Sequence, residues 1–349
     1  MQLQQRINAF IELGTFLKHF ASETSAIEAP INENKVHFEA MQSAIVSAKN
    51  TNGWFTDDNL AYAFKSWSEA LTQEQLTNWL SPYKISEERT AKAISIVMAG
   101  NIPLVGFHDF LCVLLAGHKA IAKVSSNDAA LLPVLSNFLI AQEPAFKERI
   151  TITSEKLPDF DAVIATGSDN TALYFNHYFG KYPSIIRKNR NSVAIIDGTE
   201  SKAEMEALAN DVFRYFGLGC RNVSKLYVPE GYDWDHLFNG MYSWKDVINN
   251  HKYMNNYDYN KAVYLMSLIP LLDNEFLLLK EDTAFSSPIS VLFYQTYKDG
   301  TTLEALLAAE KAHIQCIVSK NHVPFGRAQK PNLNDYADGV DTMAFLLDL

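Results

Sequence analysis

The stretch AISIVMAGNIPLVGFHDFLCVLLAGHKAIAKVS, residues 93–125, decides the fold. A short apolar run, 93–100, ends at a glycine, and a longer apolar run follows it and closes at Gly117. A second short run occupies 119–125. Short apolar runs are typical of buried strands, and a longer run between two of them is typical of a crossover helix. The stretch therefore predicts two parallel strands joined by a buried helix.

The same alternation continues along the chain. A helix is predicted over 126–141, with Ser126 or Asn127 as its N-cap, then a strand over 161–168 and a helix over 169–180. Strands that alternate with helices in this way are typical of a doubly wound α/β sheet with both faces covered. Such sheets bind ligands at the carboxyl ends of their strands.

The length of 349 residues predicts about two domains. Residues 1–90 are predicted to be helical, with Thr56 or Asp57 capping one helix. The apolar stripe of the first helix either packs on the body of the protein or touches lipid. Residues 91–186 are predicted to form the first α/β unit, 187–325 a second one interlocked with it, and 326–349 a segment that returns to the body or reaches an oligomer interface. The last nine residues, DTMAFLLDL, are expected to form a strand.

Composition excludes several classes of partner and site. The net charge of −10 disfavours nucleic acid and anionic membrane surfaces as partners. The three cysteines lie far apart in the sequence, so neither a metal site nor a disulfide framework is predicted, and a reducing cytoplasm is expected. The longest uncharged apolar run, FLCVLLAG, is too short to cross a bilayer, so no transmembrane segment is expected.

Cys220 is the cysteine with chemical interest. A single cysteine is most often a small buried hydrophobe, and the surroundings of Cys112 and Cys316 predict that role for them. Cys220 instead follows a helical stripe and lies behind Gly217 and Gly219, in a turn where backbone N–H groups can be free. Its local sequence leaves a core residue and a nucleophile as alternatives.

Three strand ends carry polar groups of chemical interest. Asn101 follows the strand at 93–100 and either caps a helix or donates its amide to an oxyanion. Thr166-Gly167-Ser168 precedes a helix and resembles an anion-binding turn, although no GxGxxG fingerprint is present. Lys123 either points into solvent or reaches a ribose hydroxyl or its 2′-phosphate.

The order of these segments resembles the aldehyde dehydrogenase superfamily. AGNIPLVGFHDFLCVLLAGHKAIAKVSSND (99–128), IATGSDN (164–170) and FGLGCRNVSKLYVP (216–229) match its Asn-x-Pro and Lys-Pro-Ser segments, its Thr-Gly-Ser turn and its cysteine segment. GLGCRN, FSSPISVLFY and FGRAQKPNLNDYADGVDTMAFL more narrowly resemble the LuxC-type long-chain fatty-acyl-CoA reductases. The resemblance covers about residues 90 to 349, and the helical N-terminal region fits the narrower family.

The resemblance implies an aldehyde dehydrogenase-like α/β fold, with a nicotinamide cofactor-binding domain at 91–186 and a catalytic thiol domain at 187–325. Cys220 is implied as the nucleophile, and Asn101 as an oxyanion donor beside the backbone N–H of Cys220. The implied cofactor contacts are Lys123 and Ser125 at the adenosine ribose, and Thr166, Gly167 and Ser168 near the pyrophosphate.

Two departures from the superfamily pattern bear on the reaction. Arg187 stands where aldehyde-oxidising members carry the glutamate that activates water, so reduction of an acyl donor is favoured over oxidation of an aldehyde. Arg187, Lys188 and Arg190 form a basic cluster that is either a solvated loop or helps to lower the thiol pKa or bind coenzyme A phosphates. AFSSPIS (284–290) lacks the carboxylate that holds the nicotinamide ribose in the superfamily.

The resemblance therefore implies reduction of a fatty-acyl thioester to the aldehyde through a thioacyl-cysteine, with NADPH as cofactor and NADH as the alternative. A semialdehyde dehydrogenase or acyl-phosphate reductase and an inactive cofactor-binding scaffold are the other candidates. The expected partners are fatty-acyl-CoA or another acyl donor, an acyl-transfer partner enzyme and further copies of the chain in a homo-oligomer.

Overall fold

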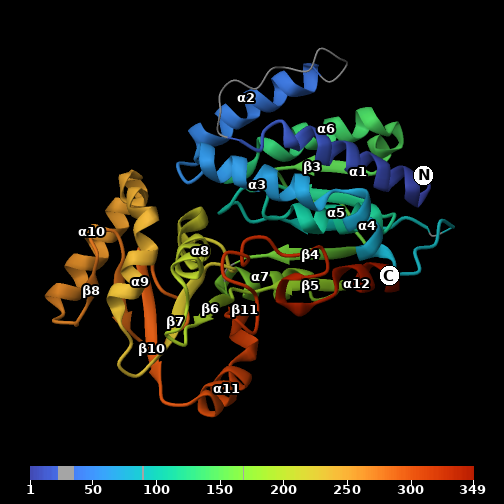
Figure 1. Cartoon of the computed structure of the whole chain (residues 1–349). Helices are drawn as coiled ribbons and strands as arrows, with labels where there is room; N and C mark the ends of the chain where they lie inside the picture. Colours follow the sequence, from blue (N-terminus) through green and yellow to red (C-terminus); the bar gives the residue numbers. More distant parts are fainter. Residues whose placement is uncertain (23–34, 89, 168) are drawn as a thin grey trace. The chain divides into compact units, whose positions relative to one another are not determined.

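The computed structural model describes residues 1–22, 35–88, 90–167 and 169–349. The chain forms two compact units. The first contains Met1–Lys188 and Asn332–Leu349, and the second contains Asn189–Pro331. The N-terminal helices thus belong to the same unit as the first α/β sheet, and the chain returns to this unit at its end (Figure 1).

The sheet of the first unit has five parallel strands in the order β3-β2-β1-β4-β5. Its strands are β1 (Ala93–Val97), β2 (Lys119–Lys123), β3 (Ile150–Thr153), β4 (Ala162–Thr166) and β5 (Ser184–Arg187). Its crossover helices are α5 (Phe107–Leu115), α6 (Leu131–Gln142) and α7 (Asp169–Phe179). The predicted doubly wound α/β architecture is confirmed. The strand order reverses between β1 and β4, and such a switch point is where open α/β sheets bind ligands.

Two predicted helix starts are wrong. α5 begins at Phe107 rather than directly after β1, because a loop with Leu104 at a left-handed φ of 57° intervenes. Asn101 lies in that loop and does not cap the helix. α6 begins at Leu131 without a side-chain cap, and Ser126 and Asn127 lie instead in a short 3₁₀ turn.

Four N-terminal helices belong to this unit: α1 (Leu3–Lys18), α2 (Lys35–Thr51), α3 (Asp57–Ala70) and α4 (Gln73–Leu80). Of these, α1 packs on the crossover helices α5 and α6, and α2 packs on α6. Thr56 caps α3 by accepting the N–H of Asn59. The apolar stripe of α1 is buried, and Phe16 of α1 stacks on Phe138 of α6 with ring centroids 4.4 Å apart. Of the two readings of this stripe, packing on the body of the protein is therefore confirmed.

The C-terminal residues form helix α12 (Thr342–Asp348), so the predicted strand is wrong. Asp341 accepts the N–H of Ala344 at 2.8 Å and thereby caps the helix. His118 holds its last turn by a 2.8 Å hydrogen bond to the carbonyl of Leu346. A short apolar run fits either a helix or a strand, and here a capping aspartate and packing against α5 select the helix.

The second unit has a six-stranded sheet in the order β11-β6-β7-β10-β9-β8, parallel except for β8. Its strands are β6 (Asn191–Ile195), β7 (Val223–Pro229), β8 (Leu272–Asp273), β9 (Leu278–Glu281), β10 (Val291–Tyr297) and β11 (Ile314–Val318). Its helices are α8 (Lys202–Phe213), α9 (Trp234–Met241), α10 (His251–Met266) and α11 (Gly300–Ala309). The described residues of the two units also form the 3₁₀ helices η1 (Ser126–Asp128), η2 (Pro144–Glu148), η3 (Arg214–Gly217), η4 (Tyr242–Asn249), η5 (Lys311–His313) and η6 (Ala337–Gly339).

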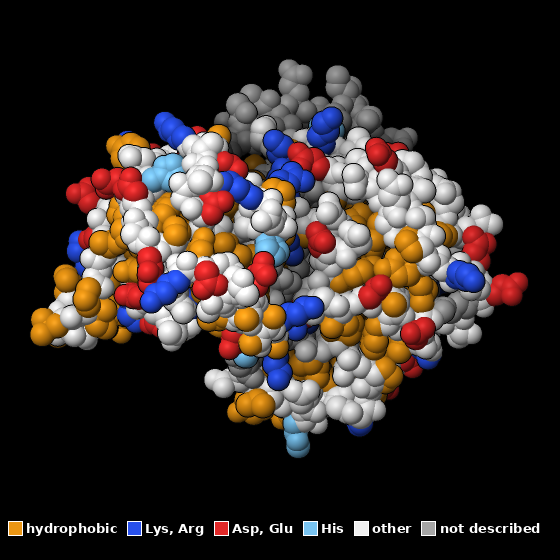
Figure 2. Space-filling model, turned by 60° about the horizontal axis from the view of Figure 1, so that its bottom comes forward, with side chains coloured by type: hydrophobic (Ala, Val, Ile, Leu, Met, Phe, Trp, Pro, Cys, Tyr) orange, Lys and Arg blue, Asp and Glu red, His pale blue; other side chains and the backbone are white. Residues whose placement is uncertain are grey.

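Two surface properties bear on the expected partners. Within the described ranges, no helix is both long enough and apolar enough to span a bilayer. On the face shown in Figure 2, basic and acidic side chains are interspersed.

Candidate active site

Cys220 lies in the turn that connects α8 to β7 and is exposed, so its reading as a core residue is wrong. The turn ends three residues later, where β7 begins at Val223. By contrast, Cys112 is fully buried in α5, and burial raises the pKa of its thiol well above the usual range. Cys316 is half-buried, so its predicted core position is only partly met. Cys220 therefore carries the accessible thiol of the three.

The backbone before Cys220 is strained. Tyr215, Phe216 and Gly217 have φ values of 55°, 56° and 76°, which are left-handed conformations. Bulky residues rarely adopt them, and each costs about 1–3 kcal/mol that the surroundings must offset. This strained run reverses the chain at the end of α8 and leaves Cys220 exposed.

The hydrogen bonds of the Asn222 side chain help to offset this backbone strain. Its side-chain nitrogen lies 3.1, 3.2 and 2.7 Å from the carbonyl oxygens of Asp211, Val212 and Arg214 at the end of α8. Its side-chain oxygen accepts the N–H of Gly219 at 2.8 Å. Because terminal helix carbonyls lack partners within the helix, the two N–H groups of this buried amide are shared among the three carbonyls and fix the turn at the same time.

Ser192 fixes the other side of the turn. Its hydroxyl, at the start of β6, donates to the carbonyl of Cys220 at 3.0 Å. The same hydroxyl lies 3.1 Å from the sulfur of Cys316 in β11. The backbone of Cys220 is therefore attached to the parallel sheet of its own unit.

At the carboxyl ends of β1 and β2 in the first unit, two loops are packed closely. A Cβ on Gly100 would lie 2.6 Å from Oγ of Ser125, so only glycine fits there. The buried side chain of Asn52 donates to the carbonyls of Gly100 at 3.1 Å and Asn127 at 3.4 Å. Asn52 directly follows the last residue of α2. Sequence analysis missed it because its contact with Gly100 spans 48 residues.

Asn101 is exposed at this edge, in the loop between β1 and α5. Asp128 steadies the loop by accepting the N–H of Leu104 at 2.9 Å. Burial raises the pKa of Asp128 to about 6, and the hydrogen bond from Leu104 opposes the shift. The loop that carries Asn101 is thus held by a hydrogen bond, and the side chain of Asn101 is accessible. An amide that donates to a ligand requires both.

The remaining predicted cofactor contacts are distributed along the same edge. Lys123 ends β2 and donates to the carbonyl of Glu155 at 2.8 Å. Thr166 ends β4, and Gly167 follows it so closely against α7 that a Cβ would lie 2.9 Å from Thr171. Ser168 lies outside the described residues. The predicted residues of the first unit that are described therefore lie at the carboxyl edge of its sheet, while Cys220 belongs to the second unit.

Arg187 does not lie in a solvated loop, so that reading of it is wrong. It ends β5 in the first unit, is buried, and pairs with Asp109 of α5 through two hydrogen bonds, one of 2.8 Å. Its guanidinium also donates to the hydroxyl of Thr342 at 3.0 Å. Lys188 is exposed and Arg190 is half-buried. The ion pair connects β5, α5 and α12 and is a structural element of the first unit.

Two residues of β7 that sequence analysis missed anchor the segment AFSSPIS and Thr283, the residue before it. Ser224 donates to the carbonyl of Phe285 at 2.6 Å, and Lys225 donates to that of Thr283 at 2.8 Å. Lys225 is fully buried, and burial lowers its pKa to about 8. These bonds attach the segment to the strand that follows Cys220.

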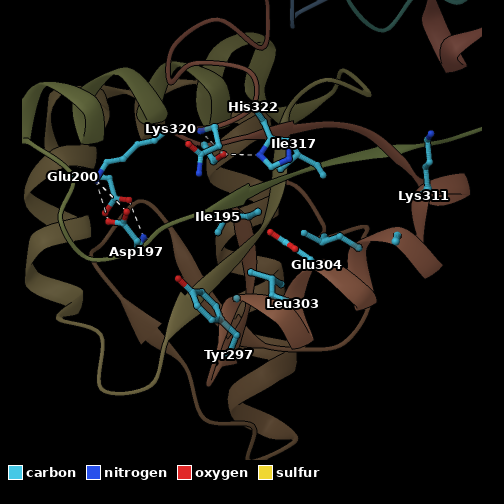
Figure 3. A pocket seen from close by; sticks show the side chains of 15 residues that line it. Ile195, Asp197, Glu200, Tyr297, Leu303, Glu304, Lys311, Ile317, Lys320 and His322 are labelled. Atoms are coloured by element: carbon cyan, nitrogen blue, oxygen red, sulfur yellow. Dashed lines mark hydrogen bonds and ion pairs between the residues drawn. The ribbon is translucent and has the colours of Figure 1, made fainter.

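A pocket of about 510 Å³ lies elsewhere in the second unit (Figure 3). It is lined at the carboxyl ends of β6, β10 and β11 by Ile195, Tyr297 and Ile317, and Asp197, Glu200 and Lys320 lie together at its rim (Figure 3). Cys220 precedes β7, which runs parallel to β6, so the thiol lies at the amino ends of these strands. The pocket and Cys220 therefore lie at opposite ends of the strands of one sheet.

Comparisons with known proteins identify the family of this chain. Residues 15–235 match the family described as acyl-CoA reductase (LuxC). A stretch of 170 residues is 26% identical to long-chain acyl-protein thioester reductase 2 of Photobacterium leiognathi, and it covers 44% of this chain and 36% of that protein. The chain thus matches little more than a third of the length of this relative.

Solved structures show the fold. Aldehyde dehydrogenase 21 of Physcomitrella patens superimposes on all of this chain and 84% of its own, with a TM-score of 0.64 at 14% identity. An NAD-dependent aldehyde dehydrogenase of Sinorhizobium meliloti covers 91% of this chain and 75% of its own, with a TM-score of 0.60 at 13% identity. The chain therefore has the aldehyde dehydrogenase fold and belongs to the acyl-CoA reductase (LuxC) family of oxidoreductases.

Proposed function

We propose that this protein reduces a fatty-acyl thioester to the fatty aldehyde with NADPH, through a thioacyl intermediate on Cys220. The observation that carries the proposal is the exposure of Cys220 on a strained turn that Asn222 and Ser192 hold in place. Strain of this kind is concentrated at functional sites because it positions a group in advance. A thiol in that setting, in a chain of this family, suits acyl transfer.

In the first step the Cys220 thiolate attacks the carbonyl carbon of the acyl thioester. The electron pair of the C=O bond moves to oxygen, and the oxyanion accepts hydrogen bonds from the Asn101 amide and the backbone N–H of Cys220. When the C=O bond re-forms, the bond to the donor sulfur breaks, and coenzyme A leaves as a thiolate that takes up a proton. The acyl group is then held on Cys220 as a thioester.

The residues of the first unit fit a nicotinamide dinucleotide. Gly100 and Gly167 allow the backbone at the carboxyl edge to pack closely on Ser125 and Thr171, beside the β1/β4 switch point where open α/β sheets bind ligands. Lys123 and Ser125 would hold the adenosine ribose, and Thr166, Gly167 and Ser168 the pyrophosphate at the start of α7. When bound, the reduced cofactor supplies the hydride that converts the acyl group to an aldehyde.

The choice of NADPH rests on Lys123, whose ammonium can meet a 2′-phosphate once it leaves the carbonyl of Glu155. Similar solved structures include an NAD-dependent aldehyde dehydrogenase and an NADP-dependent enzyme of E. coli, so the fold accommodates both cofactors. NADH is accordingly the alternative.

Protection of the thioester from water supports reduction over hydrolysis. The position that carries the water-activating glutamate in aldehyde-oxidising relatives is Arg187, and its guanidinium is engaged by Asp109. A cation cannot take a proton from water, so no base acts from that position. The name of the Photobacterium relative, a long-chain acyl-protein thioester reductase, supports a long acyl chain. An acyl-transfer partner, a homo-oligomer and a cytoplasmic location stay predictions.

The test is a turnover assay with myristoyl- or palmitoyl-CoA and NADPH, comparing the wild type with Cys220→Ser and Cys112→Ser and analysing the products for aldehyde. We expect oxidation of NADPH and equimolar aldehyde in the wild type and Cys112→Ser, and neither in Cys220→Ser. Turnover that persists in Cys220→Ser, or that yields a fatty acid in place of the aldehyde, would refute the proposal.

A further inference from the structure

Asp211 lies in the last turn of α8 and is fully buried. Both of its carboxylate oxygens accept backbone N–H groups from a distant segment: Oδ2 accepts Gly326 at 2.6 Å, and Oδ1 accepts Ala328 at 2.9 Å. Gly326 has a φ of +81°, and a Cβ there would lie 3.0 Å from that of Ala207. The segment 326–328 is therefore held directly against α8 by a single carboxylate.

The same segment is attached to the turn at residues 218–222, which contains Cys220 and is here named the nucleophile turn. Arg221, the residue after Cys220, donates from Nε to the carbonyl of Ala328. On the other side, the main-chain carbonyl of Asp211 accepts a hydrogen bond from the side-chain nitrogen of Asn222. The side-chain oxygen of Asn222 accepts the N–H of Gly219. The two neighbours of Cys220 in the chain are thus both connected to Asp211, one through segment 326–328 and the other through Asn222.

We propose that the ionised carboxylate of Asp211 is a positioning residue, which fastens segment 326–328 to the nucleophile turn and thereby sets the reactivity of the Cys220 thiol. The proposal rests on the proposed function for the role of Cys220 as the nucleophile. Asp211 itself does not touch the reacting atoms in this account. It acts through the backbone on either side of the thiol.

The ionised state matters because of the donors that face Asp211. A carboxylate accepts strongly at both oxygens, whereas a protonated carboxyl has a hydroxyl at one of them, which donates and is a much weaker acceptor for an N–H group. Burial raises the pKa of Asp211 to about 7, opposed by the two N–H groups and by the charge of Arg221. Arg214 is engaged by Asn210 and Trp244, and Arg327 is exposed.

The direction of the pH effect follows from this. Above a pH of about 7 the carboxylate is ionised and both hydrogen bonds are made. As the pH falls through about 7, protonation disrupts one of the two bonds, and segment 326–328 loosens from the turn. The reactivity of Cys220 should therefore fall over this range by more than the loss of thiolate accounts for.

The test measures alkylation of Cys220 by iodoacetamide from about pH 6 to about pH 9, with intact mass and peptide mapping as readouts. The variants are Asp211→Asn, which has a similar volume and does not titrate, and Asp258→Asn, an exposed control on α10. We expect the wild type and the control to show a step near neutral pH in addition to thiol ionisation. Asp211→Asn should lose this step and react about tenfold more slowly at the alkaline end, as expected for a lost hydrogen bond to a charged group.

An alkylation profile of Asp211→Asn that matches the wild type in both rate and shape would overturn the proposal. If the variant does not fold, hydrogen exchange of the wild type replaces it. Protection of the Gly326 and Ala328 amides, corrected for intrinsic exchange, should fall as the pH is lowered through neutrality, and constant protection would equally overturn the proposal. Alkylation needs neither acyl-CoA nor NADPH, so absence of reductase turnover alongside a normal pH step would refute only the proposed function.

Discussion

The side-chain oxygen of Asn222 accepts the backbone N–H of Gly219 at 2.8 Å, so a hydrogen bond closes the turn around Cys220. The nitrogen of the same amide lies within hydrogen-bond distance of three carbonyl oxygens at the end of α8. One side chain therefore connects the end of the helix to Gly219, the residue before Cys220. The position of the thiol depends on a residue that makes no contact with substrate in this account.

Replacing Asn222 by alanine should damage both folding and thiol reactivity. The substitution leaves buried backbone groups without partners, and each such group costs about 1–3 kcal/mol. We expect the free energy of unfolding in urea to fall by at least that amount, and alkylation of Cys220 to slow in the protein that stays folded. Asn255→Ala, at an exposed position of α10, is the control and should change neither. An unchanged free energy of unfolding for Asn222→Ala would show that the turn does not depend on this side chain.

Asn101→Ala should lower the rate of acyl reduction with little effect on the fold. Loss of one oxyanion donor typically reduces kcat by about 10²–10³, because the donor acts mainly in the transition state. Asn101 is exposed, so thermal stability and alkylation of Cys220 should match the wild type. Steady-state kinetics with acyl-CoA check this prediction. A kcat close to the wild-type value would remove Asn101 from the mechanism.

The pair of Arg187 and Asp109 should be a stability element. Removing one partner of a buried ion pair leaves an uncompensated charge and typically costs about 3–5 kcal/mol. We therefore expect Arg187→Met and Asp109→Asn each to lower the urea midpoint markedly. The double substitution should recover part of the loss, because it leaves no single charge behind. Fully additive losses in this double-mutant cycle would argue against a direct pair.

Gly100→Ala should weaken cofactor binding. The new Cβ would lie 2.6 Å from Oγ and 2.7 Å from Cβ of Ser125, so the loop that carries Asn101 or the one that carries Ser125 must shift. We expect a higher Kd for NADPH in a fluorescence titration, with unchanged alkylation of Cys220 in the other unit. Gly300→Ala is the matched control, since a Cβ there meets nothing within 4 Å. Equal affinities for the two variants would contradict a cofactor site at this edge.

Much of the fold could be predicted from the sequence because its main signals are local. The apolar runs of β1, β2 and β4, each followed by a helical segment, identify a doubly wound sheet without any knowledge of contacts. The turn of Cys220 could likewise be located from its flanking glycines and the helical stripe before it.

The remainder depends on contacts between residues far apart in the sequence. A basic run at Arg187 looks like a solvated loop until Asp109, 78 residues earlier, is seen to neutralise it. The link from Asp211 to Ala328 spans 117 residues and has no local signal. α12 was predicted as a strand because its apolar run is short enough for either structure, and the cap from Asp341 decides between them.

The most direct test of the account is the mass of the intact protein after incubation with palmitoyl-CoA in the absence of NADPH. We expect one palmitoyl group per chain, mapped to Cys220 and absent from Cys220→Ser. Addition of NADPH should then remove the group and release hexadecanal. A protein that stays unmodified, or that is acylated equally well in Cys220→Ser, would contradict the central claim that Cys220 carries the acyl group.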